Sequence, residues 1–198
     1  QSINNLDKTI EHVKKLKKFF PKTKTPLLIT NVGGFSVNGF WGNAEKNTAY
    51  KMLASILSKY KHSGVEIIPQ TMPPFPWHFG GQRYHNLFVK NNEILKFCKE
   101  NGIRICFDIS HSKLASNFYN IDFLEFIDDL SQVTAHLHIV DAAGISGEGL
   151  QIGKGEIDFK TIFPKIQDSF SGKSFVPEVW QGHKNKGEGF WEAFNRLS

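Results

Sequence analysis

The sequence predicts an α/β fold in which helices alternate with the strands of a parallel sheet. Short runs rich in β-branched residues recur along the chain, and a segment with helical periodicity follows each of them. Acidic and imidazole side chains lie at or just beyond the ends of four of these runs. With 198 residues, of which 40% are hydrophobic, the chain can bury a substantial core, and residues 1–198 are expected to form one domain.

The order of elements follows from apolar periodicity and from residues that stop helices. Pro21 ends the first helix, Asn43 caps the second, Gly64 follows its end, and Asn120 is expected to cap a later helix. The predicted helices cover 3–20, 43–60, 86–100, 121–130, 158–170 and a last segment that ends near 197. The predicted strands cover 26–30, 64–68, 103–107, 133–140 and 174–179.

Two connections are rich in turn residues. The loop after the second strand contains too many prolines and glycines for a helix or central strand, and its Trp77 is expected either to stack on a sugar or to pack over the sheet edge. The stretch 147–155 matches no standard phosphate loop, because Ile152 occupies the place of the third glycine. We expect it to form a loop over the site, from which Lys154 reaches an anionic group.

Composition and charge indicate which kinds of binding partner and which cellular compartment to expect. The net charge of +5 comes largely from lysines in and just after the first helix. An inward stripe is expected to be formed there by Val13, Leu16, Phe19 and Phe20. This favours a solvated helix face over a nucleic-acid interface. No apolar run approaches the roughly 18 residues that cross a bilayer. Cys98 and Cys106 are expected to be buried thiols in a reducing cytoplasm.

The residues at the strand ends indicate a metal site. Glu66, Asp108, His138 and Glu178 each follow an apolar run, and parallel strands bring such positions to one edge of a sheet. Three carboxylates and one imidazole suit Mn²⁺, Mg²⁺ or Co²⁺, and Zn²⁺ is a further candidate. Each residue also has a structural alternative, since Asp108 can cap the helix that follows its strand.

Other polar residues are expected to contact a substrate near the same edge. His111 follows Asp108 in the turn that leaves the strand. His136 shares a strand face with His138 and is either a substrate contact or a satisfied core histidine. His183 and Lys184 follow the last strand and can hold a phosphate or carboxylate at a helix N-terminus.

Two architectures fit five βα units: an open doubly wound sheet, or the last five units of a (β/α)8 barrel. A complete barrel typically needs about 250 residues. The chain begins at Gln1, so we expect it to be truncated at its N-terminus. An arc of five strands exposes two edges, which predicts a homo-oligomer or a fused synthase domain that covers them.

Several motifs, in this order, resemble the xylose isomerase-like TIM-barrel superfamily. They are Glu66, DISH (108–111), HLHIVDA (136–142), IGKGEIDF (152–159) and PEVWQGH (177–183). The resemblance implies a (β/α)8 fold of which the later strands are present. It makes Glu66, Asp108, His138 and Glu178 the ligands of one divalent metal ion and His111 a substrate contact. It also implies that Glu66 and Glu178 exchange the proton next to a carbonyl, through an enediolate.

The implied activity is the isomerisation or epimerisation of a small sugar or sugar phosphate in the cytoplasm. Similar domains are attached to sialic-acid-synthase-like proteins of bacterial surface-sugar pathways. The alternative is a non-catalytic carbohydrate-binding or structural barrel domain of a larger synthase. An abasic-site (AP) endonuclease is disfavoured, because Asn31, Gly147 and Gly149 stand where endonuclease IV has further metal ligands. Gln70 and Met72 also depart from the epimerase pattern, which has a second glutamate near this point.

Overall fold

The computed structural model describes residues 2–78 and 81–197, and its centre is a curved array of parallel strands. In chain order these strands are β1 (Leu27–Thr30), β3 (Glu66–Pro69), β7 (Ile105–Asp108), β8 (Thr134–His138) and β11 (Ser174–Val176). β1 pairs with β3, and β8 pairs with both β7 and β11. A parallel bridge from Gln70 to Cys106 connects β3 to β7. Neighbours in the sheet are therefore neighbours in the chain, as in the predicted partial (β/α)8 barrel.

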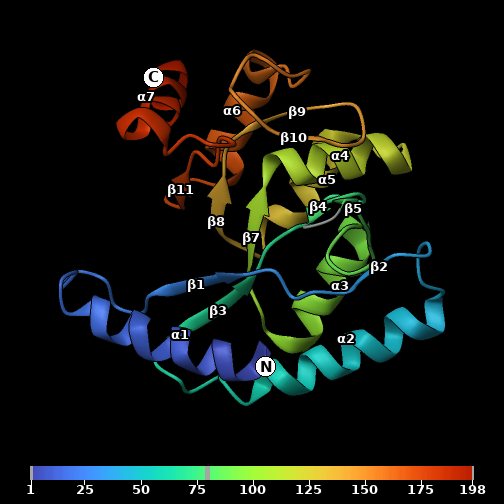
Figure 1. The fold of residues 1–198 in the computed structure, drawn as a ribbon, viewed down its shortest axis with the longest axis vertical. Coiled ribbons are helices and arrows are strands. Elements are labelled where there is room, and N and C mark those ends of the chain that lie inside the picture. Colours follow the sequence, from blue (N-terminus) through green and yellow to red (C-terminus); the bar gives the residue numbers. More distant parts are fainter. Residues whose placement is uncertain (1, 79–80, 198) are drawn as a thin grey trace.

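Helices follow the strands and cover the outside of this arc. They are α1 (Ser2–Lys17), α2 (Asn43–Ser58), α3 (Asn91–Asn101), α4 (Ile109–Tyr119), α5 (Phe123–Ser131), α6 (Phe159–Ser169) and α7 (Lys184–Leu197). Figure 1 shows β7 and β8 at the centre of the molecule, with α1 and α2 along one side and α6 and α7 at the other. Among the described residues, no helix is both long and apolar enough to cross a membrane.

In the described part of the chain, three short antiparallel strand pairs lie in the segments between these elements. β2 (Phe35–Ser36) pairs with β6 (Tyr84–His85), and β4 (Trp77–His78) pairs with β5 (Gly81–Gln82). β9 (Asp141–Ala143) and β10 (Gly147–Leu150) form a hairpin after β8. The sequence predicted plain loops here, and it was wrong because these pairs lack the long period-2 pattern of a core strand.

The two faces of the central strands differ in character. Phe107 and Leu137 face the helices and belong to the main core, together with the fully buried Phe88 and Phe126. On the opposite face, Cys106 packs near Ile68 in a second, smaller cluster. Both cysteines are free and buried, as predicted. The inner face is therefore apolar toward the amino ends of the strands, and its polar groups gather toward the carboxyl ends.

The connection after β7 contains a helix that the sequence analysis missed. α4 begins directly at Ile109 and ends at Tyr119, and the next residue, Asn120, has φ +53°. Asn120 is thus the C-cap of α4 instead of the predicted N-cap, and Asp122 caps α5 by accepting from the amides of Leu124 and Glu125. Asparagine suits both kinds of cap, so the residue type alone did not distinguish them.

The predicted inward stripe of the first helix is not buried. Leu16, Phe19 and Phe20 are 56%, 69% and 62% exposed, and only Ile10 of α1 is buried. This region lies beside β1, which pairs with one neighbour, β3, among the described strands. Little further structure therefore exists there for the stripe to pack against. The predicted oligomeric or fused partner stays a prediction.

A buried carboxylate organises the segment that follows the β9–β10 hairpin. Asp141 is fully buried and accepts hydrogen bonds from the amides of Ala142 (2.8 Å), Gly153 and Gly155 (2.9 Å each) and Ile157 (3.1 Å). A Cβ atom on Gly155 would lie 2.3 Å from the Ala142 carbonyl oxygen and 2.4 Å from the Asp141 carboxylate. The IGKG turn is thus built around this carboxylate.

We expect Asp141→Asn to lower the free energy of unfolding by about 1–3 kcal/mol, because an amide NH₂ would face backbone N–H donors in a buried place. Urea denaturation measures the difference. Asp168→Asn, at an exposed position of α6, is the matched control, and we expect it to change stability by less than about 0.5 kcal/mol. Equal stability of the two variants would contradict the role given to Asp141.

Candidate functional site

Asp108, at the carboxyl end of β7, is the centre of the candidate site. Its side chain is fully buried, and both carboxylate oxygens are engaged. Oδ1 accepts from the backbone amide of His111 at 2.9 Å and so caps α4. Oδ2 lies 3.0 Å from Nε2 of Gln70 and 3.4 Å from Nδ1 of His138. The helix-cap alternative raised by the sequence is therefore correct for one oxygen, while the other faces a cluster of polar groups.

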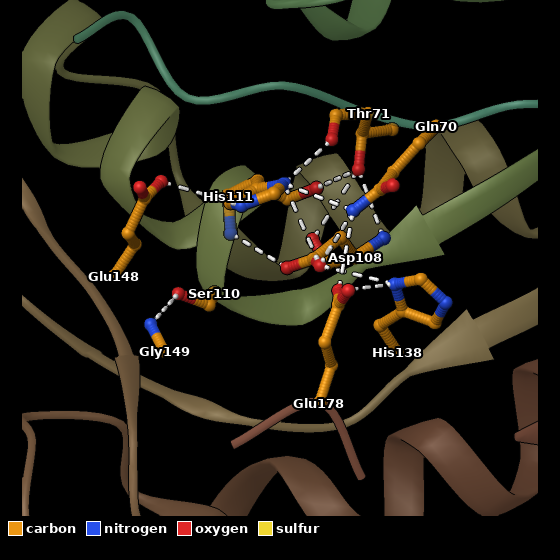
Figure 2. A network of polar contacts seen from close by, with 10 residues as sticks. Gln70, Thr71, Asp108, Ser110, His111, His138, Glu148, Gly149 and Glu178 are labelled. Carbon is orange, nitrogen blue, oxygen red and sulfur yellow. Dashed lines mark hydrogen bonds and ion pairs between the residues drawn. The ribbon is translucent and has the colours of Figure 1, made fainter. Parts of the chain in front are cut away.

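His138 and Glu178 complete this cluster from neighbouring positions of the sheet edge. His138 is the last residue of β8, and its Nδ1 atom lies 2.6 Å from Oε2 of Glu178. Glu178 follows β11, which ends before Pro177 because proline cannot donate to the strand ladder. One ligand atom each from Asp108, His138 and Glu178 lies within 4.8 Å of the others. Figure 2 shows the three side chains converging.

Glu66 does not join the cluster. It is the first residue of β3, and its carboxylate forms a two-point ion pair with Arg104 at 2.7 and 2.5 Å. Gln70 lies four steps further along the chain, or roughly 13 Å at the usual rise of a strand. The predicted metal-ligand and proton-transfer roles of Glu66 are corrected by this geometry. The sequence analysis placed the strand over 64–68, so a residue at its start was taken for one near its end.

Gln70 occupies the position in the cluster that was predicted for Glu66. It follows β3 directly, and its Nε2 atom lies 3.0 Å from Asp108, 3.3 Å from Nδ1 of His111 and 3.5 Å from Oε2 of Glu178. The sequence contained a signal for it, since Gln70 is the polar residue that ends the apolar run IIP. A neutral amide thus stands beside two carboxylates and one imidazole.

His111 links the cluster to the β9–β10 hairpin. Its Nδ1 atom lies 2.9 Å from the carbonyl oxygen of Thr71, so Nδ1 carries a hydrogen and donates it. Its Nε2 atom lies 3.4 Å from Oε2 of Glu148 in β10. Figure 2 shows Glu148 approaching His111 from the side away from His138. Glu148 was missed by the sequence analysis, because only the hairpin brings it back over α4.

The electrostatics of the cluster favour cationic imidazoles beside the carboxylates. Burial alone would lower the pKa of His138, but its contacts with Asp108, Cys106 and Glu178 raise that pKa to about 12. Burial opposes the charge of His111 as well, and Asp108 and Glu148 raise the pKa of His111 to about 9. Burial would raise the pKa of Asp108, whereas His111 and His138 hold it below its usual value. The carboxylates therefore strongly favour positive charge on the His111 and His138 rings.

A cavity of about 530 Å³ opens over the cluster. Its lining includes Asp108, His111, Gln70, Glu148, Glu178, Asn31, Trp180, His183 and Lys184. A larger cavity of about 610 Å³ lies at the amino ends of the strands, near Glu66 and Arg104. We assign the site to the smaller cavity, because the carboxylates and imidazoles meet there and because barrel enzymes use the carboxyl ends of their strands.

The structure places the residues predicted to contact a substrate in four different ways. His183 and Lys184 line the cavity. His136 is buried one layer below His138 and receives a 2.7 Å contact between its Nδ1 atom and Oγ of Ser174, while burial and then His138 lower its pKa. Lys154 is exposed in the turn held by Asp141 and is not among the cavity residues. The side chain of Trp77 lies outside the described part of the structure.

Comparison with known proteins gives similarities in sequence and in fold. The chain is 28% identical over 119 residues to the uncharacterized protein MJ1311 of Methanocaldococcus jannaschii. The aligned residues make up 60% of this chain and 38% of that protein. The probable 3-DHS dehydratase AsbF of Bacillus anthracis superposes with a TM-score of 0.64 at 15% identity, covering 98% of this chain and 71% of that one. D-psicose 3-epimerase of Clostridium cellulolyticum H10 gives a TM-score of 0.64 at 13% identity, with 95% and 67% covered.

These structural similarities show the fold. The chain spans less than two-fifths of the length of the curated relatives that it matches. A family model described as "Xylose isomerase-like TIM barrel" matches residues 1–197, and the chain therefore belongs to the xylose isomerase-like TIM-barrel family.

Proposed function

We propose that this chain carries the site of a metal-dependent isomerase or epimerase that acts on a small sugar or sugar phosphate. The observation that supports this most directly is the convergence of Asp108, His138 and Glu178 beneath a cavity at the carboxyl ends of the strands. The similarity of the fold to a D-psicose 3-epimerase adds support. An attachment to sialic-acid-synthase-like proteins stays a prediction from the sequence.

The donor set fits one divalent cation. Two carboxylates and one imidazole supply hard oxygen and nitrogen ligands, which suit Mn²⁺, Mg²⁺ or Co²⁺ and also admit Zn²⁺. Asp108 is buried, and burying a carboxylate is costly without a positive partner. Asp108, His138 and Glu178 would hold the ion, and rotation of the Gln70 amide would offer its oxygen as a further ligand.

The chemistry follows from the groups around the cavity. When bound, the ion would polarise a substrate carbonyl and so acidify the neighbouring C–H group. Glu178, whose side chain is 53% exposed, would take that proton as a general base, and the bonding electrons would pass into an enediolate. Nε2 of His111 faces the cavity from the other side of Asp108 and would contact a hydroxyl group. Lys184 would pair with a phosphate or carboxylate of the substrate.

Dehydration is a second candidate reaction, because the fold is equally similar to a probable 3-DHS dehydratase. It would use the same first step, removal of a proton next to a carbonyl. A conjugated product, detected by ultraviolet absorbance, separates it from epimerisation, which forms none. A non-catalytic carbohydrate-binding role is the remaining alternative, and it needs no metal ion.

We expect the protein to bind one Mn²⁺ ion, and Glu178→Gln to weaken that binding at least about tenfold, because a charged ligand is replaced by an amide. Electron paramagnetic resonance of free Mn²⁺ gives the affinity. Glu66→Gln is the matched control: we expect an unchanged affinity and a loss of at most about 1 kcal/mol of stability from the partly exposed ion pair with Arg104. No Mn²⁺, Co²⁺ or Zn²⁺ uptake by the wild-type protein would favour the non-catalytic role.

We also expect Gln70→Glu to strengthen Mn²⁺ binding by about tenfold, because it adds a negative charge beside Asp108 and Glu178. The same titration measures it. The added charge repels the two carboxylates when no ion is present, so thermal stability without metal should fall. Weaker Mn²⁺ binding by this variant would show that Gln70 does not adjoin the ion.

In D₂O with Mn²⁺, we expect the protein to introduce deuterium next to the carbonyl of at least one ketose among D-tagatose, D-allulose and L-ribulose, and His138→Ala to reduce the rate by about a hundredfold or more. Proton NMR follows the exchange. Full exchange by His138→Ala would remove the metal cluster from the mechanism.

A further inference from the structure

The β9–β10 hairpin places a second cavity-facing glutamate across from Glu178. The Glu148 carboxylate lies 3.4 Å from Nε2 of His111, and its side chain is 25% exposed in the cavity lining. In Figure 2, Glu148 and Glu178 reach the cluster from different directions, with His111 between Glu148 and Asp108. Two carboxylates thus border the cavity from separate elements, one on β10 and one after β11.

The backbone that follows Glu148 is held in place by hydrogen bonds. The amide of Gly149 donates to Oγ of Ser110 at 3.3 Å, and the carbonyl oxygen of Gly149 accepts from the amide of Trp180 at 2.8 Å. The buried Asp141 carboxylate fixes the turn that follows β10. A Cβ atom on Gly149 would lie 3.2 Å from Cβ of Trp180, which leaves little room for this strand to shift. Glu148 is therefore a positioned group.

The proposed reaction needs such a group. Inverting a carbon requires removal of a proton from one face and delivery of a proton to the other. Glu66 lies at the far end of β3, and Gln70 is an amide that does not carry a proton to and from a substrate. Asp108 has both oxygens engaged. Among the described residues that line the cavity, Glu148 is the carboxylate that remains beside Glu178.

We propose that Glu148, paired with Nε2 of His111, is the second proton-transfer group of this site, and that the reaction is an epimerisation next to a ketone. This rests on the proposed function. Because Nδ1 of His111 donates to the Thr71 carbonyl, its Nε2 atom faces the Glu148 carboxylate at 3.4 Å, and a proton can pass between these two groups.

The step balances in protons and electrons. Glu178 takes the proton from the substrate carbon, and the C–H electron pair moves into the enediolate. The Glu148–His111 pair then gives its proton to the opposite face of that carbon, and the enediolate electrons form the new C–H bond and restore the carbonyl. Glu178 ends with one proton more and the pair with one fewer, and exchange with water resets both.

The test compares Glu148→Gln with the wild-type protein, loaded with Mn²⁺ in D₂O, on the same three ketoses. We expect the variant to bind Mn²⁺ within about twofold of the wild type, because Glu148 is not a ligand. Glu178 should still exchange deuterium into the substrate with retained configuration. Formation of the epimer should fall by about a hundredfold or more, and Glu148→Asp should restore part of it.

Glu188→Gln, an exposed glutamate of α7 that contacts Asn185, is the matched control and should behave as the wild type. Epimer formation by Glu148→Gln at the wild-type rate would overturn the inference, and so would a loss of Mn²⁺ binding in a folded variant. A wild-type protein that binds no Mn²⁺ and exchanges no deuterium would instead refute the proposed function, and this inference with it.

Discussion

The buried carboxylate of Asp108 is the interaction on which the rest of the site depends. A fully buried carboxylate is tolerated only where donors or cations surround it. One oxygen accepts from the backbone amide of His111 in the first turn of α4. This hydrogen bond fixes where the helix begins and therefore where His111 lies. The other oxygen faces His138 and Gln70, so the same side chain joins the ends of three neighbouring strands. Support of the helix and assembly of the cluster cannot be separated at this residue.

Around this centre, regular elements and connections contribute in different ways. His138 and Asp108 end adjacent strands whose register places them side by side. Glu178 and Glu148 come from connecting segments. Pro177 ends β11 just before Glu178, and the Asp141 carboxylate holds the turn that follows the β9–β10 hairpin of Glu148. The hairpin brings Glu148 to the cavity within a short connection. The Asp141 carboxylate also accounts for the IGKG motif, because the amides of Gly153 and Gly155 both donate to it.

The edges of the arc are the least self-sufficient part of the molecule. β1 and β11 each have one paired neighbour among the described strands, and Phe175 and Val176 of β11 are 42% and 46% exposed. Exposed strand edges invite pairing with another segment or chain.

The sequence by itself determined the alternation of strands and helices, the family, and the convergence of Asp108, His138 and Glu178, because each follows an apolar run whose direction in a parallel sheet is fixed. It did not determine which end of its strand Glu66 occupies. The predicted strand began at residue 64 and the observed strand begins at Glu66, and in a strand of four residues this shift places Glu66 at the start. It also missed Gln70 as the residue beside Asp108, and α4, whose cap is that aspartate. Glu148 became part of the site only through the tertiary structure. Its position depends on a hairpin and on a buried carboxylate, contacts between residues far apart in sequence that no local pattern records.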